Sequence, residues 1–480
     1  MIVRAVGLSH TPGQMRLMPA PCWSVSVVTT SLKVLELTIL LVLISLTTSV
    51  GGMLWAHDWI WPRSVLLVIA LCSVVAFETL RMSGAYRLRR LTSGHGQWRR
   101  TGFAALTAGL TGMGVLLLLD APYAIVAGLG GMLLVSISIT LSVARAGATW
   151  VLAGWLRDGR FATKVAVVGQ GPVADALADR LVENETGLLQ IVGRYAAEAG
   201  PGGNWRGNLD TLELDCKLRR LDAVIMADSW TAAGPLVERL SAFAQDFYAM
   251  PDPVEGPGQA RATRLMGEPL VLLWERPLKD WQGLRKAAFD RVAAALILLL
   301  VAPLLAVVAV LIKIESPGPV FFRQFRVGFN NQLFSILKFR SMRNDAADRL
   351  ASQQTIRGDA RVTRVGAVLR RTSVDELPQL INVLLGEMSL VGPRPHAPGT
   401  SAEGKPIHAL VVHYGRRHLV RPGITGLAQV RGFRGGMHTT QHVLDRLQAD
   451  LEYIRRQSLR LDVRIIMMTV IREMRSKNAF

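Results

Sequence analysis

The chain has 480 residues, half of them hydrophobic, and carries a formal net charge of +19. This length is too great for one ordinary core, so we expect two or three domains, and the blocks of apolar residues indicate an integral membrane protein. The charge would suit anionic lipid or a phosphate-rich substrate; because no zinc spacing or RNA-binding aromatic motif accompanies it, we expect no nucleic-acid partner.

Four apolar segments near the N-terminus, at residues 34–55, 64–80, 102–119 and 123–143, are predicted to span the membrane. The basic residues lie before the first segment, between the second and third, and after the fourth: Arg4, Arg16, Lys33, Arg81, Arg87, Arg89, Arg90, Arg99, Arg100, Arg145, Arg157, Arg160 and Lys164. The positive-inside rule then places both termini in the cytoplasm. We predict a cytoplasmic tail at residues 1–32 and a four-helix transmembrane bundle at 33–147.

A strand-turn-helix pattern follows the bundle. A short β-branched run leads into Gly169 and Gly171, and Ala174 stands at the third glycine position of a dinucleotide-binding motif. This pattern predicts a Rossmann-like α/β domain at residues 160–275. The glycine turn could bind a nucleotide at a helix N-terminus, or it could be a tight turn that binds nothing. We favour the second interpretation and predict no cofactor there.

Further buried strands of this domain are predicted at residues 222–226 and 269–273. The stretch rich in proline and glycine at residues 250–267 is predicted to be a loop or linker.

Residues 292–312 are uncharged and long enough to cross a bilayer, yet Pro303 lies near their middle. Both flanks are basic, and a crossing helix would carry one of them outside. We therefore predict a re-entrant helix-break-helix at residues 289–314 that enters and leaves the same leaflet. The alternative is a fifth, kinked span, which would place the rest of the chain outside the cell.

The stretch at residues 370–395 carries the chemistry, because Asp375 and Glu376 follow two arginines and precede a Gly-Pro-Arg-Pro turn. A carboxylate can attack phosphorus and form an acyl phosphate. At 4 Å each pair of like charges costs about 4 kcal/mol at an effective dielectric of 20, so attack on a pyrophosphate requires cations. An isolated Asp-Glu pair is common on exposed helices, but the arginines, the turn and the re-entrant segment favour phosphoryl chemistry on a lipid. Mg²⁺ suits a site of carboxylates and phosphates.

Several motifs between residues 281 and 480 occur in an order that resembles the bacterial sugar transferase family: SPGPVFFRQFRVG, LKFRSM, RRTSVDELPQLINVLLGEMSLVGPRPH and RPGITGLAQVRG. These monotopic phosphoglycosyl transferases move a hexose 1-phosphate from a nucleotide diphosphosugar to polyprenol phosphate. The resemblance implies an α-rich catalytic domain at residues 281–480. The four spans and the Rossmann-like domain resemble the long-form members that begin exopolysaccharide or O-antigen synthesis.

The resemblance also implies residue roles. Asp375 would be the nucleophile that forms the phosphosugar-enzyme and would help to hold Mg²⁺, and Glu376 would complete the dyad as metal or acid-base partner. Arg370 would bind phosphate, and Arg394 would help to bind the nucleotide. The other basic residues predicted to bind substrate are Lys338, Arg340, Arg361, Arg371, Arg421 and Arg434.

The segment HYGRRHLVRPGITGLAQVRGFRGG resembles the signature of members that transfer glucose 1-phosphate. Leu427 replaces a Trp and Arg431 an Asn of many relatives, which leaves galactose or N-acetylhexosamine phosphate as alternatives. We favour structural or phosphate-contact roles for His413 and His418 over metal binding. The C-terminal apolar stripe with basic residues predicts either an amphipathic helix on an anionic leaflet or a helix of the domain core.

The predicted reaction joins glucose 1-phosphate from UDP-glucose to undecaprenyl phosphate and releases UMP. The predicted partners are a UDP-sugar, undecaprenyl phosphate, membrane lipid and a second copy of the chain, at the cytoplasmic face of a bacterial inner membrane. Two other classes stay open: a nucleotide-sugar oxidoreductase, although no Tyr-x-x-x-Lys pair follows the glycine loop, and a non-catalytic membrane scaffold.

Overall fold

The computed structural model divides the chain into two compact units, one of residues 20–163 with 185–190 and one of the remaining residues. The described residues are 24–55, 62–94, 96–183, 188–196, 205–218, 220–227, 239–251, 261–265, 267–342, 359, 361–411, 413–433, 435 and 439–475.

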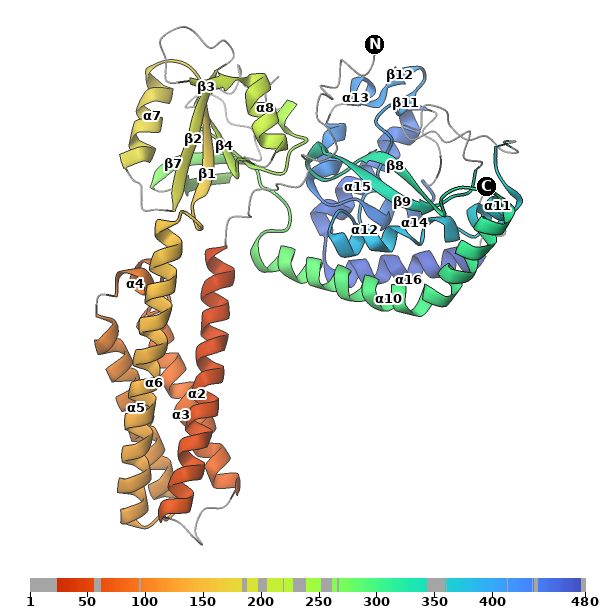
Figure 1. The fold of residues 1–480 in the computed structure, drawn as a ribbon. Coiled ribbons are helices and arrows are strands. Elements are labelled where there is room, and N and C mark those ends of the chain that lie inside the picture. Colours follow the sequence, from red (N-terminus) through yellow and green to blue (C-terminus); the bar gives the residue numbers. More distant parts are fainter. Residues whose placement is uncertain are drawn as a thin grey trace. The chain divides into compact units, whose positions relative to one another are not determined.

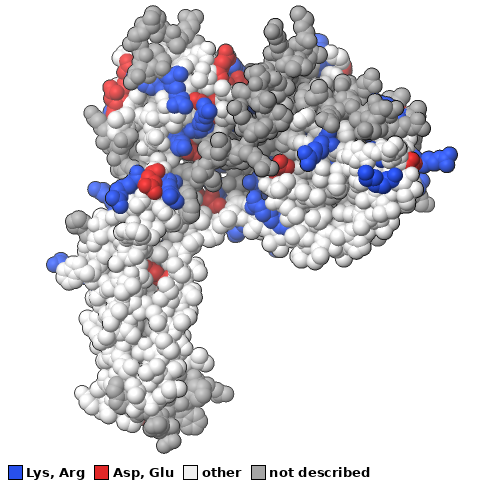
Figure 2. Space-filling view, in the orientation of Figure 1, with Lys and Arg blue, Asp and Glu red and all other residues white. Residues whose placement is uncertain are grey.

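The first unit is a bundle of long helices (Figure 1). It contains α2 (Val25–Trp55), α3 (Pro62–Met82), α4 (Leu88–Ser93), α5 (Gln97–Leu118) and α6 (Tyr123–Arg157). Small residues such as Ala104 and Ala108 are fully buried and let the helices pack closely, and Glu36 forms a buried ion pair of 2.7 Å with Arg145. Figure 2 shows almost no charged side chain along most of the bundle, as expected of a surface that faces lipid.

By length and composition, four helices among the described residues could cross a membrane: Val25–Gly51, Gln97–Leu118, Tyr123–Arg157 and Asp280–Glu315. Three of the four N-terminal spans predicted from the sequence are among them. The second predicted span coincides with α3, which is a helix of 21 residues.

The middle domain is built on a mixed seven-stranded sheet in the order β3-β2-β1-β4-β5-β7-β6. Its elements are β1 (Thr163–Val168), α7 (Pro172–Glu183), β2 (Leu189–Ala196), β3 (Trp205–Asn208), α8 (Leu209–Lys217), β4 (Ala223–Met226), β5 (Asp246–Ala249), β6 (Arg261–Leu265) and β7 (Glu268–Trp274). Strand β4 pairs in parallel with β1 and β5, whereas β7 pairs antiparallel with β5 and β6.

The strands predicted in this domain are confirmed, because β1, β4 and β7 lie where their apolar runs placed them. Gly169 and Gly171 have φ angles of 144° and 89°, conformations that favour glycine and turn the chain from β1 into α7. The loop predicted at residues 250–267 is wrong in part, since Arg261–Leu265 forms β6. Its hydrogen bonds to β7 outweigh the turn-forming composition around it.

The catalytic domain predicted from the sequence is mostly helical (Figure 1). Its helices are α10 (Asp280–Glu315), α11 (Arg364–Arg371), α12 (Gln379–Leu385), α13 (Ile407–Leu410), α14 (Leu427–Val430), α15 (Thr440–Arg456) and α16 (Leu459–Arg475), with 3-10 turns η1 (Phe329–Asn331), η3 (Val374–Glu376) and η4 (Tyr414–Leu419). A hairpin joins β8 (Phe321–Val327) to β9 (Leu333–Phe339), and two further pairs join β10 (Ser389–Val391) to β13 (Gly423–Thr425) and β11 (Ser401–Ala402) to β12 (Lys405–Pro406).

Helix α10 contains Pro303 but continues through it as one helix of 36 residues, which Figure 1 shows as bent. The predicted helix-break-helix is therefore a single kinked helix, because proline removes a backbone hydrogen bond without ending the helix here. One face of α10 packs on the domain through Ala294, Val308 and Ile312. The other face exposes a row of apolar side chains: Val292, Leu296, Leu299, Leu300, Leu304, Val307, Val310, Leu311 and Ile314.

For helix α16 the sequence left two structures open, an amphipathic surface helix and a helix of the domain core, and the structure has features of both. Its Asp462 and Ile465 are fully buried in the domain, whereas Val463, Met467 and Val470 are exposed. The helix thus belongs to the domain core and also presents an apolar outer face.

Candidate active site

The Asp375–Glu376 pair lies on η3, a tight turn between α11 and α12. Ser373 precedes the turn with φ of 58°, a left-handed conformation that ends α11 and reverses the chain. Because successive side chains of a 3-10 turn are about 120° apart, the two neighbouring carboxylates point in different directions. The local backbone therefore gives each carboxylate its own surroundings.

Three separate elements meet at the Glu376 carboxylate. Lys338 on β9 lies 2.9 Å from Glu376 Oε1. Arg394, in the turn after β10, donates to Glu376 Oε2 at 2.9 Å and to Oε1 at 2.5 Å, which is a bidentate pair. Burial alone would raise the pKa of Glu376, but the two cations outweigh burial and hold that pKa well below its ordinary value. Glu376 is therefore a fixed anion that ties β9, η3 and the 392–395 turn together.

Asp375 is also buried, with 8% of its surface exposed. Among the described residues, no hydrogen bond or ion pair reaches its carboxylate, in contrast to its neighbour. Burial raises the pKa of Asp375 to about 6, and the charge of Glu376 acts in the same direction, while Lys338, Arg370 and Arg394 oppose both. Asp375 is thus a carboxylate with free oxygens inside a basic surround, which is the arrangement that a nucleophile requires.

The two arginines before the pair differ in their surroundings. Arg370 donates from Nε to Ser341 Oγ at 2.9 Å. Burial lowers the pKa of its guanidinium, and the Asp375 carboxylate opposes that shift, so the two charges lie close enough to interact. Arg371 is exposed on the same helix. Arg370 is therefore placed to act beside Asp375.

The other predicted basic residues are placed as follows. Arg340 is buried and donates to the carbonyls of Ile312, Ser316 and Pro317 at 2.6–3.1 Å, so it closes the C-terminal end of α10. Arg361 pairs with Asp359 at 2.6 Å, and Arg421 is half-buried at the start of the segment that leads into β13. Arg434 lies outside the described residues. Substrate contacts of these residues stay a prediction.

Close approach of two backbones fixes the turn that carries Arg394. Gly392 N donates to Thr425 O at 2.9 Å, and Gly423 N donates to Pro393 O at 3.0 Å. A Cβ at Gly392 would collide with the carbonyl of Arg421, and one at Gly423 would collide with Gly392 N. The two glycines are therefore required by the packing of this turn against β13.

A buried ion pair behind the turn was not predicted from the sequence. Arg417 pairs with Asp450 at 2.7 Å and donates to the carbonyl of Arg394 at 2.7 Å. Both side chains are almost fully buried, with exposures of 1% and 2%. No local motif links these positions, since they come together only through packing of η4 against α15.

Two further basic groups lie in this region, an arginine and a stacked pair of histidines. Burial lowers the pKa of Arg326 to about 10, and the nearby charge of Arg394 adds to that shift. His396 stacks on His418 with ring centroids 5.2 Å apart, and burial lowers the pKa of His418 to about 3. Both histidines are neutral near pH 7. In the part of the chain that the structure describes, no group of three or more His, Cys, Asp or Glu side chains could hold a metal.

The chain is similar to known proteins over much of its length. Residues 281–476 match the bacterial sugar transferase family. Over 371 residues the chain is 42% identical to an undecaprenyl-phosphate glucose phosphotransferase of Komagataeibacter xylinus, covering 76% of this chain and 69% of that protein. Over 336 residues it is 39% identical to the UDP-glucose:undecaprenyl-phosphate glucose-1-phosphate transferase of Escherichia coli K12, covering 68% and 71%.

A third relative acts on another sugar. It is the UDP-N-acetylgalactosamine-undecaprenyl-phosphate N-acetylgalactosaminephosphotransferase of Aeromonas hydrophila, 44% identical over 186 residues, which cover 38% of this chain and 42% of that protein.

The geometry of Glu376 generates a stability prediction. Replacing Glu376 by Gln leaves Lys338 and Arg394 without their shared anion, which we expect to cost about 2 kcal/mol near pH 7. This loss in free energy of unfolding is smaller than that expected for a fully buried ion pair. The Lys338 and Arg394 side chains are 16% and 25% exposed, so water screens them in part. The measurement is thermal unfolding in detergent, with Asp179→Asn, which removes the charge of an exposed aspartate on α7, as control.

The stability difference between wild type and Glu376→Gln depends on pH, and its direction follows from the lowered pKa of Glu376. Because the folded-state pKa of Glu376 is depressed, its contribution is fully present above the ordinary value of 4.5 and is lost as pH falls through the folded-state pKa. The difference in stability between wild type and Glu376→Gln should therefore become smaller as the pH is lowered. If the two proteins are equally stable at pH 7, or if their difference in stability grows in acid, the ion pairs assigned to Glu376 would be contradicted.

Proposed function

Since the chain belongs to the bacterial sugar transferase family, we propose that it transfers a hexose 1-phosphate, most directly glucose 1-phosphate, from a UDP-sugar to undecaprenyl phosphate. The products are UMP and undecaprenyl diphosphate sugar, the first membrane-bound intermediate of an exopolysaccharide. The names of the relatives from K. xylinus and E. coli support this substrate pair. One observation carries the proposal: Asp375 has free oxygens beside a neighbour whose oxygens are occupied by cations.

The reaction proceeds in two displacements at one phosphorus. An Asp375 oxygen attacks the phosphorus that bears the sugar, the bond from that phosphorus to the UMP oxygen breaks, and UMP leaves with the electron pair. A phosphate oxygen of undecaprenyl phosphate then attacks the same phosphorus, and the bond to Asp375 breaks. The carboxylate is regenerated and the new diphosphate links lipid and sugar.

The basic residues offset charge as the donor binds. Arg370 interacts with Asp375, and Arg394 lies nearby through its ion pair with Glu376, so a diphosphate at Asp375 would meet guanidinium groups from two elements. Glu376 cancels part of the local positive charge and keeps Lys338 and Arg394 in place when no substrate is bound. Fixed cations of this kind act most strongly where charge moves in the transition state.

We also propose that Mg²⁺ takes part, held by Asp375 together with Glu376 and the substrate phosphates. The donor set fits, because Mg²⁺ is commonly bound through one or two carboxylates plus phosphate oxygens and water. Asp375 has free oxygens for this role, whereas Glu376 would have to loosen one of its ion pairs. When bound, the ion would neutralise developing charge on the diphosphate.

The proposed location is the cytoplasmic face of the inner membrane, with α10 as a re-entrant helix. Helix α10 has 36 residues, and a straight helix of that length spans about 54 Å, more than the ~30 Å hydrocarbon core. Both of its ends nevertheless bind one domain: Lys286 pairs with Asp462 at 2.9 Å, and the carbonyl of Ile312 accepts from Arg340 at 3.1 Å. A helix so held, with one apolar face exposed, fits a segment that dips into a single leaflet.

Glucose is the sugar we favour. Leu427 is buried in the domain core, and Arg431 pairs with Glu452 at 2.5 Å, so the two departures from the glucose signature are accommodated by packing and by an ion pair. The A. hydrophila relative makes N-acetylhexosamine the main alternative, with galactose next. The free Asp375 counts against a non-catalytic scaffold.

The middle domain we interpret as a Rossmann-like regulatory or assembly module. The strand order β3-β2-β1-β4-β5 and the glycine turn after β1 support that class. A nucleotide-sugar oxidoreductase would need hydride chemistry at this turn, for which the sequence offers no Tyr-x-x-x-Lys pair. A homodimer stays a prediction.

The function predicts a large effect of Asp375→Asn. Removing the nucleophile should lower UMP release from UDP-glucose by at least about a thousandfold, while the thermal unfolding midpoint changes little. Asp445→Asn, on α15, is the matched control and should retain activity. Full activity of Asp375→Asn, or release of UDP in place of UMP, would refute the proposal.

The re-entrant arrangement can be tested with single cysteines introduced in a chain without its native cysteines. The two positions are Gln282 and Pro319, on either side of the apolar part of α10. The arrangement predicts that both are accessible from the same side of the membrane. A membrane-impermeant thiol reagent should reach both positions in inside-out vesicles and neither in right-side-out vesicles. Labelling of the two positions from opposite sides would establish a fifth span instead.

A further inference from the structure

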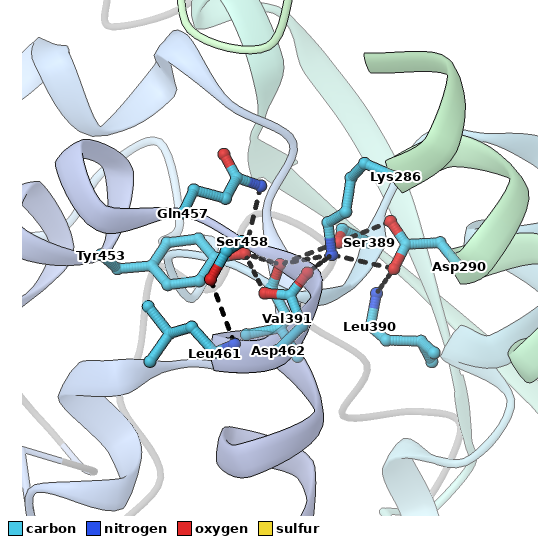
Figure 3. A network of polar contacts seen from close by, with 10 residues as sticks. All are labelled: Lys286, Asp290, Ser389, Leu390, Val391, Tyr453, Gln457, Ser458, Leu461 and Asp462. Atoms are coloured by element: carbon cyan, nitrogen blue, oxygen red, sulfur yellow. Dashed lines mark hydrogen bonds and ion pairs between the residues drawn. The ribbon is translucent and has the colours of Figure 1, made fainter. Parts of the chain in front are cut away.

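A second cluster of charged side chains lies in the catalytic domain and plays no part in the reaction described above (Figure 3). Lys286 and Asp290 come from α10, Ser389 from β10, Tyr453 from α15 and Asp462 from α16. All five residues are at most 5% exposed. Burying so many polar groups is costly unless each finds a partner, so their arrangement is informative.

The charges of this cluster do not balance. Lys286 Nζ lies 2.9 Å from Asp290 Oδ1 and 2.9 Å from Asp462 Oδ2. If both aspartates were ionised, one ammonium would face two carboxylates and a net negative charge would be buried. Other titratable or charged groups facing Asp462 are Asp290 from α10 and Tyr453 from α15; β10 adds only the Ser389 hydroxyl and a carbonyl. One additional proton would make the cluster neutral.

The contacts of the Ser389 and Tyr453 hydroxyl groups also indicate that the cluster holds an additional proton. Ser389 Oγ lies 2.8 Å from both Asp290 Oδ2 and the Val391 carbonyl oxygen. Tyr453 OH lies 2.9 Å from that same carbonyl and 2.8 Å from Asp462 Oδ1. Each hydroxyl has a single proton, so these four short oxygen-oxygen contacts share two hydroxyl protons, and one more proton on a carboxyl would leave only the Ser389–Val391 contact without a proton of its own.

The missing proton can be assigned to one carboxyl. Asp290 receives donors only, from Lys286, from Ser389 and from Leu390 N at 3.4 Å, so it is the ionised acceptor. The Ser389 proton therefore goes to Asp290, since a charged acceptor binds it more strongly than a carbonyl does. The Tyr453 proton then goes to the Val391 carbonyl, and the Asp462–Tyr453 contact needs a proton from Asp462.

We propose that Asp462 is protonated and donates to Tyr453, whose hydroxyl in turn donates to the Val391 carbonyl, and that this relay positions the turn carrying Arg394. Burial raises the pKa of Asp462, and the Asp290 charge adds to it, while Lys286 and Tyr453 oppose both. Gln457 donates to the Tyr453 oxygen at 3.2 Å and holds the phenol from the other side.

The relay reaches the active site through three residues of backbone. Val391 is followed directly by the 392–395 turn, whose Arg394 forms the bidentate pair with Glu376. The Val391 carbonyl also accepts from Lys286 Nζ, but at the longer distance of 3.4 Å, so loss of the Tyr453 bond would loosen this turn and misplace the guanidinium. Misplacement of a catalytic group by about 1 Å can cost on the order of a hundredfold in rate. Asp462 and Tyr453 would therefore affect the reaction by positioning Arg394, without touching the substrate.

Two isosteric variants separate this proposal from an ordinary ion-pair cluster. Asp462→Asn keeps a donor toward Tyr453 and an acceptor toward Lys286, so we expect kcat within about twofold of wild type. Asp290→Asn removes the one carboxylate that the proposal leaves ionised beside the buried Lys286 ammonium, so kcat should fall by about tenfold or more. An ordinary cluster, in which each carboxylate simply pairs with Lys286, predicts similar losses in both variants.

A third variant tests the positioning role. Tyr453→Phe should lower kcat by about tenfold and leave KM for UDP-glucose within about threefold, because the turn is misplaced rather than lost. Thermal unfolding shows whether each variant is folded. Equal losses for Asp462→Asn and Asp290→Asn would overturn the protonated relay, and full activity of folded Tyr453→Phe would overturn its positioning role.

The kinetic part of this proposal rests on the proposed function, so one readout is independent of it. The infrared carbonyl band of a buried protonated carboxylic acid should be present in the wild-type protein near pH 7 and missing from Asp462→Asn. Its absence from wild type would refute the protonated state whatever reaction the enzyme catalyses. If wild type shows the band but releases no UMP, the proposed function fails and the protonation assignment stands.

Discussion

The structure of the active site depends on the ion pairs of Glu376 with Lys338 and Arg394. Because these cations occupy the oxygens of one carboxylate, the adjacent carboxylate of Asp375 keeps its oxygens free. Two chemically similar side chains, adjacent in sequence, thereby acquire different roles. One holds three segments of the chain together, and the other is available for attack on phosphorus.

The remaining architecture supplies the parts that this arrangement needs. The β8–β9 hairpin brings Lys338, and the glycine contacts between the 392–395 turn and β13 bring Arg394. Behind the turn, Arg417 binds the carbonyl of Arg394 and Tyr453 binds that of Val391. Helix α10 joins these supports to an exposed apolar face, which suits the proposed reaction with a lipid acceptor.

The sequence predicted the fold where local pattern is decisive. Apolar runs of sufficient length gave most of the bundle, and the β-branched runs at β1, β4 and β7 gave the middle strands. Strand β6 was missed because turn-forming composition surrounds it and only its pairing with β7 makes it a strand. Pro303 was expected to break α10, but packing of both halves on one domain keeps the helix continuous.

For the candidate site, motif resemblance predicted Asp375, Glu376 and Arg394, which the structure brings into one region, whereas the network behind them could not be predicted from the sequence. Arg417 and Asp450 are far apart in the chain, as are Lys286 and Asp462, and no spacing rule connects them. Arg340 was predicted to contact substrate from its charge alone, which stays a prediction, and the structure shows its terminal nitrogens donating to the end of α10 and the loop that follows.

The central claim is that Asp375 forms a covalent bond to the phosphorus that bears the sugar. The most direct measurement is mass spectrometry of proteolytic fragments after incubation with UDP-glucose in the absence of undecaprenyl phosphate. The account predicts a hexose-phosphate adduct on Asp375 that disappears when the lipid acceptor is added. An adduct on a different residue, or turnover to lipid product with no adduct at any stage, would contradict it.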